Sequence, residues 1–308
     1  MDDGDERHAL IRHTTRQFAD AKIRPVAVEL DRSERFPEDL YREMGELGLF
    51  GITIPQDMGG AGADCVAYAI VMEELSRGYA SIADQCGLVE LVATLLAEHG
   101  TPAQRQGYLT PMLQARRRTA YAITEAEAGS DVAGIRTTAT RTPGGWQLDG
   151  STLGIHNAPV ADFAVVLART DATAGKRGMS IFLVDLDRRG VRAGAKEHKM
   201  GQRASPVGAL FFDGVELPGE ALLGPLNRGF HLMMSVLDKG RVGIGALAVG
   251  ILQAALDASV EHANARHQFG HAIAGFQAIQ WLIADMAKSL HAARLLVRDA
   301  AQTLDRGE

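Results

Sequence analysis

The spacing of apolar residues changes twice along this sequence of 308 residues, and these changes constrain the fold more than any other feature. Apolar residues recur at helical intervals over 6–117, alternate with polar residues over 119–223, and return to helical intervals from 227 onward. Short strands without intervening helices indicate an antiparallel sandwich or barrel. We therefore expect a multi-domain α+β protein with an N-terminal all-α domain at 1–118, a central antiparallel β-sandwich or barrel domain at 119–224, and an incomplete C-terminal α-helical bundle at 225–308.

Proline and capping residues predict where the N-terminal helices begin and end. Pro25 is expected to end the first helix, because proline cannot continue the helical hydrogen bonds. Asp64 and Ser81 are expected to cap two strongly apolar helices. Thr101 and Pro102 predict the start of another helix, which ends near three consecutive arginines at 116–118. We expect these arginines to be solvated, close to the last carbonyls of that helix.

Two long helices are expected at the C-terminal end, over about 229–265 and 276–304. Two helices of this length cannot bury their apolar faces on each other alone. They need partner helices, from missing sequence or from another subunit.

The central region contains seven segments with strand-like alternation. These are Ala120–Thr124, Arg136–Arg141, Trp146–Leu148, Phe163–Arg169, Ser180–Asp185, Arg192–Glu197 and Ala209–Phe212.

Composition and charge exclude several classes of protein. The net charge of −6 argues against binding to nucleic acid, which requires a basic face. Cys65 and Cys86 show no framework spacing, so we expect reduced thiols and a cytoplasmic protein. The acidic N-terminus lacks the layout of a signal peptide. The longest apolar run, Val242–Leu256, is too short for a membrane span, so no membrane insertion is expected.

The segment Tyr121–Asp131 begins like a strand and breaks into an Ala-Gly-Ser-Asp turn. Gly129 allows a close approach of the backbone to a ligand. The hydroxyls of Thr124 and Ser130 can donate to or accept from the edge of a heteroaromatic ring. A ligand-binding loop and a simple tight turn are both compatible with these residues.

Two weaker patterns favour structural interpretations. Gly243, Gly245 and Gly250 resemble a dinucleotide fingerprint, but no strand precedes them, so close helix packing is favoured. His267 and His271 have a spacing seen in zinc sites, but no third ligand accompanies them and we expect no metal.

Five segments, spread in order over the whole chain, carry the motifs of one enzyme family. They are Ile123-Thr124-Glu125 through Gly129-Ser130-Asp131, Leu148-Asp149-Gly150 to Asn157, Lys199-Met200-Gly201 with Arg203-Ala204-Ser205, Asp238-Lys239-Gly240-Arg241, and Arg266-His267-Gln268-Phe269-Gly270 with Ile273, Phe276 and Gln277. Together they resemble the signatures of the FAD-dependent acyl-CoA dehydrogenases, among them K-x-G-x-R-x-S and R-x-Q-F-G-x-x-I-x-x-F-Q.

This resemblance implies FAD between the β domain and the helical bundle, an acyl-CoA substrate, and an electron-transferring flavoprotein or similar acceptor. The cofactor-binding residues that it implies are Tyr121, Ile123, Thr124, Gly129, Ser130, Ile155, His156, Arg266, Gln268, Phe269 and Gln277. Ser130, Asp238 and Arg241 are implied near the substrate, although Arg241 could equally serve a structural ion pair. Arg266 and Gln268 would reach the FAD of a neighbouring subunit, which implies a homotetramer built as a dimer of dimers.

The implied reaction is α,β-dehydrogenation of an acyl-CoA thioester. A carboxylate removes the α-proton, the β-hydride passes to the flavin, and hydrogen bonds stabilise the developing enolate.

The sequence departs from the family pattern in two places. The family's catalytic glutamate mostly lies beyond the second long helix, where this sequence has ended, and the alternative position carries Gly240. No catalytic base is therefore identified, and the chain is expected to be short at its C-terminus. In addition, Gly154-Ile155-His156 stands where the family usually has Trp-Ile-Thr beside the flavin. His156 is either a hydrogen-bond donor or acid/base at the flavin, or a histidine without a chemical role.

These departures leave two alternatives to an active dehydrogenase. One is a non-catalytic or half-site subunit that pairs with a related subunit. The other is a flavin oxidase or monooxygenase with the same fold.

Overall fold

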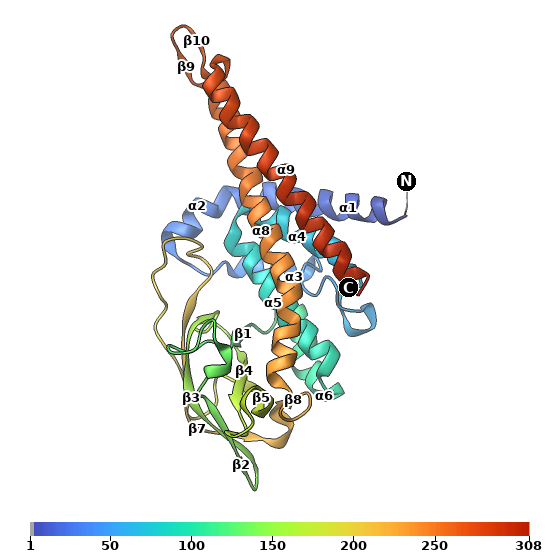
Figure 1. Ribbon diagram of the computed structural model, residues 1–308, viewed down its shortest axis with the longest axis vertical. Helices are drawn as coiled ribbons and strands as arrows, with labels where there is room; N and C mark the ends of the chain where they lie inside the picture. The colour runs from blue at the N-terminus through green and yellow to red at the C-terminus, as the bar shows by residue number, and fades with distance from the viewer. Residues whose placement is uncertain (1–2, 308) are drawn as a thin grey trace. The chain divides into compact units, whose positions relative to one another are not determined.

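The computed structural model describes residues 3–307, in which helices are followed by strands and then by helices (Figure 1). The predicted fold class is confirmed. The α-helices are α1 (Asp3–Phe18), α2 (Arg24–Ser33), α3 (Glu38–Glu46), α4 (Cys65–Gly78), α5 (Ala80–His99), α6 (Pro102–Gln104), α7 (Thr110–Leu113), α8 (Gly229–Ala265) and α9 (Gln277–Asp305). The strands are β1 (Thr119–Ala122), β2 (Thr138–Thr142), β3 (Gly145–His156), β4 (Phe163–Arg169), β5 (Met179–Asp185), β6 (Val191–Ala193), β7 (Val207–Pro218), β8 (Leu222–Leu223), β9 (His267–Gln268) and β10 (His271–Ala272).

The described chain forms two compact units that interleave along the sequence. The first unit contains the residues up to Glu29, Asp64–Gly87 and the chain from Arg241 onward. The second unit contains Leu30–Ala63 and Leu88–Gly240. These limits fall inside α2, α5 and α8, so the three predicted domain ranges stay a prediction.

The second unit is built on one sheet. Within residues 3–307, eight strands join in the order β6-β7-β3-β2-β4-β5-β8, with β1 paired to β4. Most neighbours are antiparallel, as predicted, but β4 runs parallel to β2, which it meets at a single residue pair, and to β1. The parallel pairing of β1 with β4 is possible because the β2–β3 hairpin separates these two strands in the chain and allows a crossover. Trp146 and Phe182 meet edge to face in the core of this sheet, with ring centroids 5.3 Å apart.

β3 and β7 are much longer than the strands predicted at 146–148 and 209–212, and this part of the prediction is wrong. The register between them shifts after Leu148 and again after Thr152. A bulge adds a residue to one strand and interrupts its alternation, although the pairing continues. The alternating pattern therefore stops being visible in the sequence before the strand ends.

Two of the predicted capping residues lie where they were expected. The Asp64 carboxylate accepts a hydrogen bond from the Ala67 amide at 2.7 Å and caps α4. Thr101 and Gln104 form a reciprocal capping box at the start of α6. Both caps satisfy amides that have no partner within the helix.

Two boundary predictions are wrong. Pro25 does not end the helix, because a π-helical turn at Ala19–Ile23 leads directly into α2 and places Pro25 in its first turn. A π-helical turn shifts the hydrogen-bonding pattern of the helix locally, which allows a proline inside a continuous helix. Ser81 is not a cap, because one extended residue, Tyr79, separates α4 from α5 and the new helix starts at Ala80.

The prediction of a solvated arginine cluster at 116–118 is also wrong for two of its members. Arg117 donates to the Asp185 carboxylate at 2.7 Å and lies over the rings of Tyr108 and Phe163. Arg118 pairs with Glu38 at the start of α3. The chain passes into β1 directly after these arginines, and the guanidinium groups fix that entry by ion pairing and stacking.

The glycines of α8 in the first unit allow close helix packing, as predicted. A Cβ atom at Gly243 would lie 2.1 Å from the Tyr68 hydroxyl of α4. A Cβ atom at Gly250 would lie 2.2 Å from the Glu73 carbonyl oxygen, also in α4. Only glycine allows this approach of the two helices.

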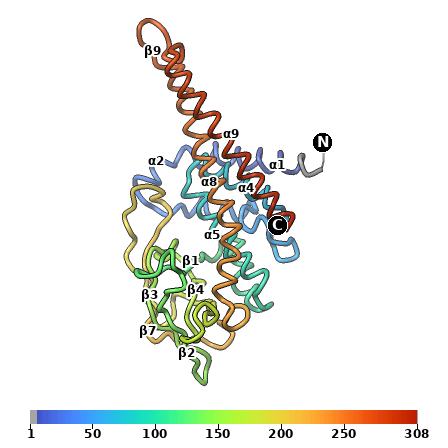
Figure 2. Tube along the Cα trace, viewed as in Figure 1, coloured from blue at the N-terminus to red at the C-terminus, as the bar shows by residue number. Residues whose placement is uncertain are grey.

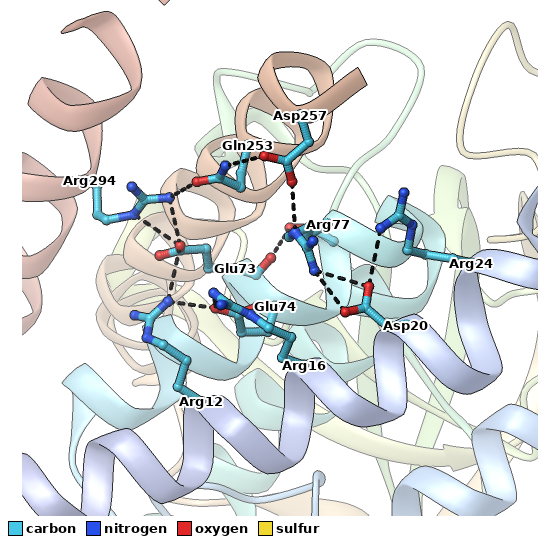
Figure 3. A network of polar contacts seen from close by, with 11 residues as sticks. Arg12, Arg16, Asp20, Arg24, Glu73, Glu74, Arg77, Gln253, Asp257 and Arg294 are labelled. Carbon is cyan, nitrogen blue, oxygen red and sulfur yellow. Dashed lines mark hydrogen bonds and ion pairs between the residues drawn. The ribbon is translucent and has the colours of Figure 1, made fainter. Parts of the chain in front are cut away.

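A network of charged groups joins α1, α4, α8 and α9 within the first unit (Figure 3). The buried Glu74 carboxylate accepts from Arg12 at 2.6 Å and from Arg16 at 2.9 Å. The neighbouring Glu73 accepts from Arg294 of α9 at 3.0 Å and from Arg12 at 3.2 Å. Buried carboxylates are tolerated because each is paired and hydrogen-bonded.

α8 and α9 pack beside each other in the first unit and are joined by the β9–β10 hairpin (Figure 2). Both helices leave large apolar side chains exposed, among them Ile244, Trp281, Leu282 and Leu296. The two helices therefore do not bury all of their apolar surface on each other, as expected. The partner that covers it stays a prediction.

Two helices, α5 and α8, are long and apolar enough to cross a membrane when length and composition alone are considered. This is weak evidence, because core helices meet the same test. The most apolar window of α5 is 83% buried, as in a core helix, whereas that of α8 is 33% buried. The absence of membrane insertion stays a prediction.

Candidate functional site

β1 leads into the predicted ligand-binding segment at 121–131. Tyr121, near the end of β1, is held by a hydrogen bond to α8. The Tyr121 hydroxyl donates to the Met233 carbonyl oxygen at 2.8 Å, which ties β1 to the first half of α8. Burial raises the pKa of Tyr121 far above its usual range, so this phenol stays protonated. Of the predicted cofactor-binding residues, Tyr121 thus already has its hydroxyl committed to the protein.

Glu125 closes the loop that follows β1. Its carboxylate accepts hydrogen bonds from the amides of Arg136 and Thr137, each at 2.8 Å. The Glu125 amide also donates to the Ala128 carbonyl oxygen, and the Ala128 amide donates back. One side chain therefore joins both ends of a loop that spans 125–137.

Arg169, the last residue of β4, supports the same loop from another side. Its guanidinium donates to the Ala133 carbonyl oxygen at 2.9 Å and to the Ile135 carbonyl oxygen at 3.1 Å. Its amide donates to the Thr137 carbonyl oxygen at 2.8 Å. The Arg169 side chain and backbone thus hold the second half of the loop in place.

Between these supports, the predicted ligand-binding residues are accessible. Gly129 and Ser130 are exposed, and a Cβ atom at Gly129 would have no neighbour within 4 Å. Ile123 and Thr124 are half-buried. Within residues 3–307, the hydroxyls of Thr124 and Ser130 make no hydrogen bond to another protein group. They remain able to donate to a ligand or accept from one.

The end of β3 lies beside this loop, because the Leu153 amide donates to the Thr124 carbonyl oxygen at 2.9 Å. The bulge after Thr152 precedes Gly154, which has a φ of +68° and open space where a side chain would start. The structure therefore brings together two of the predicted groups, the Thr124–Ser130 segment and the Gly154–His156 segment. Bulges often aim side chains at a binding site in this way.

Ile155 and His156 differ in what they can offer a ligand. The Ile155 side chain is buried in the core of the sheet, so only its backbone could contact a cofactor. His156 is half-buried, and its Nε2 atom lies 2.7 Å from the Ser205 hydroxyl oxygen. Ser205 belongs to the K-x-G-x-R-x-S segment, but the sequence did not predict its contact with His156.

Ser205 lies in a segment that Glu34 anchors to the end of α2. The Glu34 carboxylate accepts hydrogen bonds from Arg203 and His198 and pairs with the Lys196 ammonium at 3.4 Å. The hydrogen bond from Arg203, assisted by His198 and Lys196, lowers the pKa of Glu34 from 4.5 to about 2 and outweighs the opposing effect of burial.

This depressed pKa predicts a pH dependence of stability. Because the folded-state pKa of Glu34 is lowered, its stabilising contribution is complete above pH 4.5 and is lost as the pH falls from 4.5 towards 2. We expect Glu34→Gln to lower the urea midpoint at neutral pH, and we expect its difference from wild type to shrink over that interval. Glu46→Gln, at the exposed end of α3, is the control. A difference that stays constant from pH 7 to pH 2 would contradict the assignment.

The remaining predicted cofactor residues lie in the first unit. Arg266, Gln268 and Phe269 are exposed on the β9–β10 hairpin, and Phe269 is 90% exposed with a φ of +52°. Gln277 is exposed at the start of α9, and Arg241 is exposed in α8. The structure thus gathers Arg266, Gln268 and Phe269 in one hairpin of the first unit.

The two predicted residues of α8 in the second unit are Asp238 and Gly240. Asp238 is exposed. A Cβ atom at Gly240 would lie 2.9 Å from a methyl group of Leu91 in α5, so this position is packed against a neighbouring helix. The position at which the resemblance implied an alternative base holds neither a carboxylate nor open space here.

An ion pair with a buried carboxylate, which the sequence did not reveal, lies next to Gly240. The Lys239 ammonium donates to the hydroxyls of Thr53 at 2.7 Å and Thr94 at 3.0 Å, and lies 3.8 Å from the Glu90 carboxylate. The buried Glu90 also accepts from the amides of Ile52 at 2.8 Å and Thr53 at 3.1 Å. It thereby joins α5, the loop at 52–53 and α8. An isolated Glu in an apolar helical pattern was the only signal in the sequence.

Comparison with known proteins identifies this arrangement. Three family models match in order: the N-terminal domain of acyl-CoA dehydrogenase over residues 5–116, the middle domain over 120–215, and the C-terminal domain over 227–308. The chain is 40% identical over 305 residues to the mitochondrial short-chain specific acyl-CoA dehydrogenase of Sus scrofa, covering 97% of this chain and 73% of that protein.

Two further similar proteins support the same family assignment. The caffeyl-CoA reductase–Etf complex subunit CarC of Acetobacterium woodii is 40% identical over 303 residues, which are 97% of this chain and 80% of that protein. The structure of butyryl-CoA dehydrogenase from Megasphaera elsdenii superimposes with a TM-score of 0.93 at 34% identity, covering 100% of this chain and 81% of that one. The resemblance stated from the motifs is thus confirmed, and the chain belongs to the acyl-CoA dehydrogenase family.

Proposed function

We propose that this protein is an FAD-dependent oxidoreductase that removes a hydrogen pair from the α,β-bond of an acyl-CoA thioester. The observation that carries this proposal is the loop at 125–137, held by Glu125 and Arg169 with Gly129 and Ser130 exposed. Relatives named for acyl-CoA oxidation and for acyl-CoA reduction support the substrate class.

The residues present fit a flavin. The edge of a flavin ring offers both donors and acceptors, and the hydroxyls of Thr124 and Ser130 can serve either role. The open space at Gly129 and Gly154 leaves room for a flat ring system close to the backbone. His156 adds a nitrogen that can donate or accept near neutral pH. When bound, FAD would supply the two-electron acceptor.

The chain's own residues would act chiefly by holding that ligand in a fixed environment. Glu125 and Arg169 keep the loop backbone in place before binding, so little ordering is needed when the ligand arrives. Thr124 and Ser130 would hold the ring edge, and His156 would lie on the side of the loop next to β3. Fixed donors of this kind stabilise developing charge without reorganisation.

A second candidate function is a half-site subunit that supports the active site of a related subunit. One observation favours it: position 240 carries glycine packed against Leu91 and therefore offers no carboxylate for removal of the α-proton. Both candidates require FAD binding, whereas only the first requires reduction of the bound flavin by an acyl-CoA.

Reconstitution with FAD tests the property that both candidates share. The purified full chain is mixed with FAD, freed of excess ligand, and examined for the visible flavin bands and for quenching of flavin fluorescence. We expect saturable binding. A chain that is folded by circular dichroism but binds no FAD would overturn the proposal.

The acceptor of the electrons is the second part of the proposal. CarC is named as a subunit of a complex with Etf, and we propose an electron-transferring flavoprotein as the redox partner here. Reduced protein should pass electrons to such a flavoprotein in a stopped-flow mixing experiment. Failure of every electron-transferring flavoprotein tested, while an artificial dye is reduced, would count against this partner.

Glu125→Gln provides a sharper test of the loop. The amide side chain cannot accept two backbone hydrogen bonds with the strength of a carboxylate, so the loop should loosen. We expect the dissociation constant for FAD to rise roughly 10-fold, since weakening one charged hydrogen bond costs about 1.4 kcal/mol. Glu127→Gln, exposed in the same loop, is the matched control and should bind FAD like wild type. Equal affinities for the two variants would refute the role of Glu125.

A further inference from the structure

Glu34 combines a strained backbone with an unusually rich set of partners. Its φ is +54°, in the left-handed region that residues other than glycine rarely adopt. Its side chain is buried, and Arg203, His198 and Lys196 all contact its carboxylate. The Lys196 ammonium also donates to the Glu34 carbonyl oxygen at 2.6 Å. Strain of this kind persists where the surroundings fix the residue, and it points to a function.

Arg203, whose guanidinium is hydrogen-bonded to Glu34, lies in a tight turn. The turn Gln202–Ser205 is closed by the Ser205 amide, which donates to the Gln202 carbonyl oxygen at 3.0 Å. Within it, Arg203 is held twice: its guanidinium donates to Glu34, and its amide donates to the Asp31 carboxylate at 3.2 Å. Both anchors come from the end of α2, so the turn cannot move independently of that helix end.

Ser205 connects this turn to the candidate flavin site. It is fully buried, and its hydroxyl lies 2.7 Å from the Nε2 atom of His156. The adjoining backbone is also fixed, since the Asn157 amide donates to the Pro206 carbonyl oxygen at 2.8 Å. A hydrogen bond to one ring nitrogen restrains the orientation of an imidazole and biases its tautomer ratio.

We propose that Glu34 is a positioning residue for His156 and acts through Arg203 and Ser205. The series Glu34, Arg203, Ser205, His156 lies entirely within the second unit. It fixes the ring of the last residue of β3, the strand that the Leu153 amide joins to Thr124. The consequence for FAD rests on the proposed function, whereas the placement of the imidazole does not.

The alternative is a purely structural role, in which Glu34 stabilises the segment around 196–205 and has no effect on the ring of His156. The positioning role and the structural role predict different tautomer ratios for His156. Positioning predicts that loss of the Glu34 charge changes the tautomer ratio of His156 in the same direction as loss of the Ser205 hydroxyl. A stabilising role alone leaves the ring signals of the folded protein unchanged.

Nitrogen NMR of the full chain labelled with ¹⁵N-histidine separates these two roles. The His156 signals are assigned by their loss in His156→Gln. They are then compared at one pH in wild type, Glu34→Gln, Ser205→Ala and the control Glu46→Gln, with folding checked by circular dichroism. We expect Glu34→Gln and Ser205→Ala to shift both ring nitrogens in the same direction, and Glu46→Gln to match wild type.

The same four proteins are titrated with FAD. We expect the dissociation constant to rise roughly 2–10-fold in Glu34→Gln and Ser205→Ala, as for the loss of one hydrogen bond. If Glu34→Gln gives the His156 signals of wild type, the positioning role is overturned, whatever happens to FAD. If no protein binds FAD while the signals shift as expected, the positioning role holds and the proposed function fails. If Glu34→Gln does not fold, Asp31→Ala, which removes the carboxylate that accepts from the Arg203 amide, takes its place with the same expected direction.

Discussion

Replacing Glu90 with alanine is expected to lower the free energy of unfolding by about 3–5 kcal/mol, because a buried carboxylate that accepts three hydrogen bonds and faces an ammonium group is lost. The Glu90 side chain is 1% exposed and accepts hydrogen bonds from the Ile52 amide, the Thr53 amide and the Thr53 hydroxyl. Without it, two amides lose their acceptor and the Lys239 ammonium loses its counter-charge. Three chain segments that meet at this carboxylate would lose their common partner.

A double-mutant cycle separates the charge of Glu90 from its hydrogen bonds. Glu90→Gln keeps the shape of the side chain but removes its charge, and Lys239→Met removes the ammonium. If the ion pair matters, the double variant should be more stable than the sum of the single changes predicts. The measurement is the urea midpoint followed by far-ultraviolet circular dichroism. A loss below about 1 kcal/mol for Glu90→Ala, the range of an exposed pair, would show that the group is not buried and paired as described.

Gly250→Ala is expected to destabilise the first unit by about 3 kcal/mol or more, at the upper end of the range for overpacking. An added methyl group would lie 1.9 Å from the Ser76 hydroxyl oxygen, 2.2 Å from the Glu73 carbonyl oxygen and 2.9 Å from the Arg77 amide nitrogen. Two of these atoms are backbone, so α4 and α8 must separate. The same movement would disturb the Glu73–Arg294 contact shown in Figure 3.

The matched control is Gly245→Ala in the same helix. There the new methyl group would meet only a Val297 side-chain methyl, at 3.1 Å. Alanine is favoured over glycine in a helix by about 0.5–1 kcal/mol, so this change should be nearly neutral. Combining Gly250→Ala with Ser76→Ala removes the hydroxyl but not the backbone clash, and we expect little recovery. Full recovery would show that the helices are not in backbone contact.

The sequence predicted the elements best where one local signal dominates. The long helix predicted at 229–265 coincides with α8 (Gly229–Ala265), because its apolar periodicity is unbroken and Asn227 precedes it with a left-handed φ of +63°. β3 was predicted too short, because its bulges disrupt alternation while pairing with β7 continues. The helix end predicted at Pro25 was wrong, because a π-helical turn just before it changes the hydrogen-bonding register of the helix.

The candidate site shows the same division between local and long-range signals. Gly129 and Ser130 were predicted because a glycine-serine turn after a strand indicates close backbone approach. The supports of that turn were not predicted, because Arg169 lies 34 residues from the Ile135 carbonyl that it contacts, and Ser205 lies 49 residues from His156. Only the fold brings these pairs together, so no local pattern reports them.

Anaerobic titration of the FAD-loaded protein decides whether this chain oxidises an acyl-CoA with a bound flavin. Butyryl-CoA and longer or aryl-substituted acyl-CoAs are added in turn, the visible spectrum is recorded, and the released thioester is analysed by mass spectrometry. We predict that at least one acyl-CoA bleaches the flavin bands and yields a product lighter by two hydrogens. Flavin bands that stay oxidised with every acyl-CoA, in a protein that binds FAD, would contradict dehydrogenation by this chain and leave the half-site function in its place.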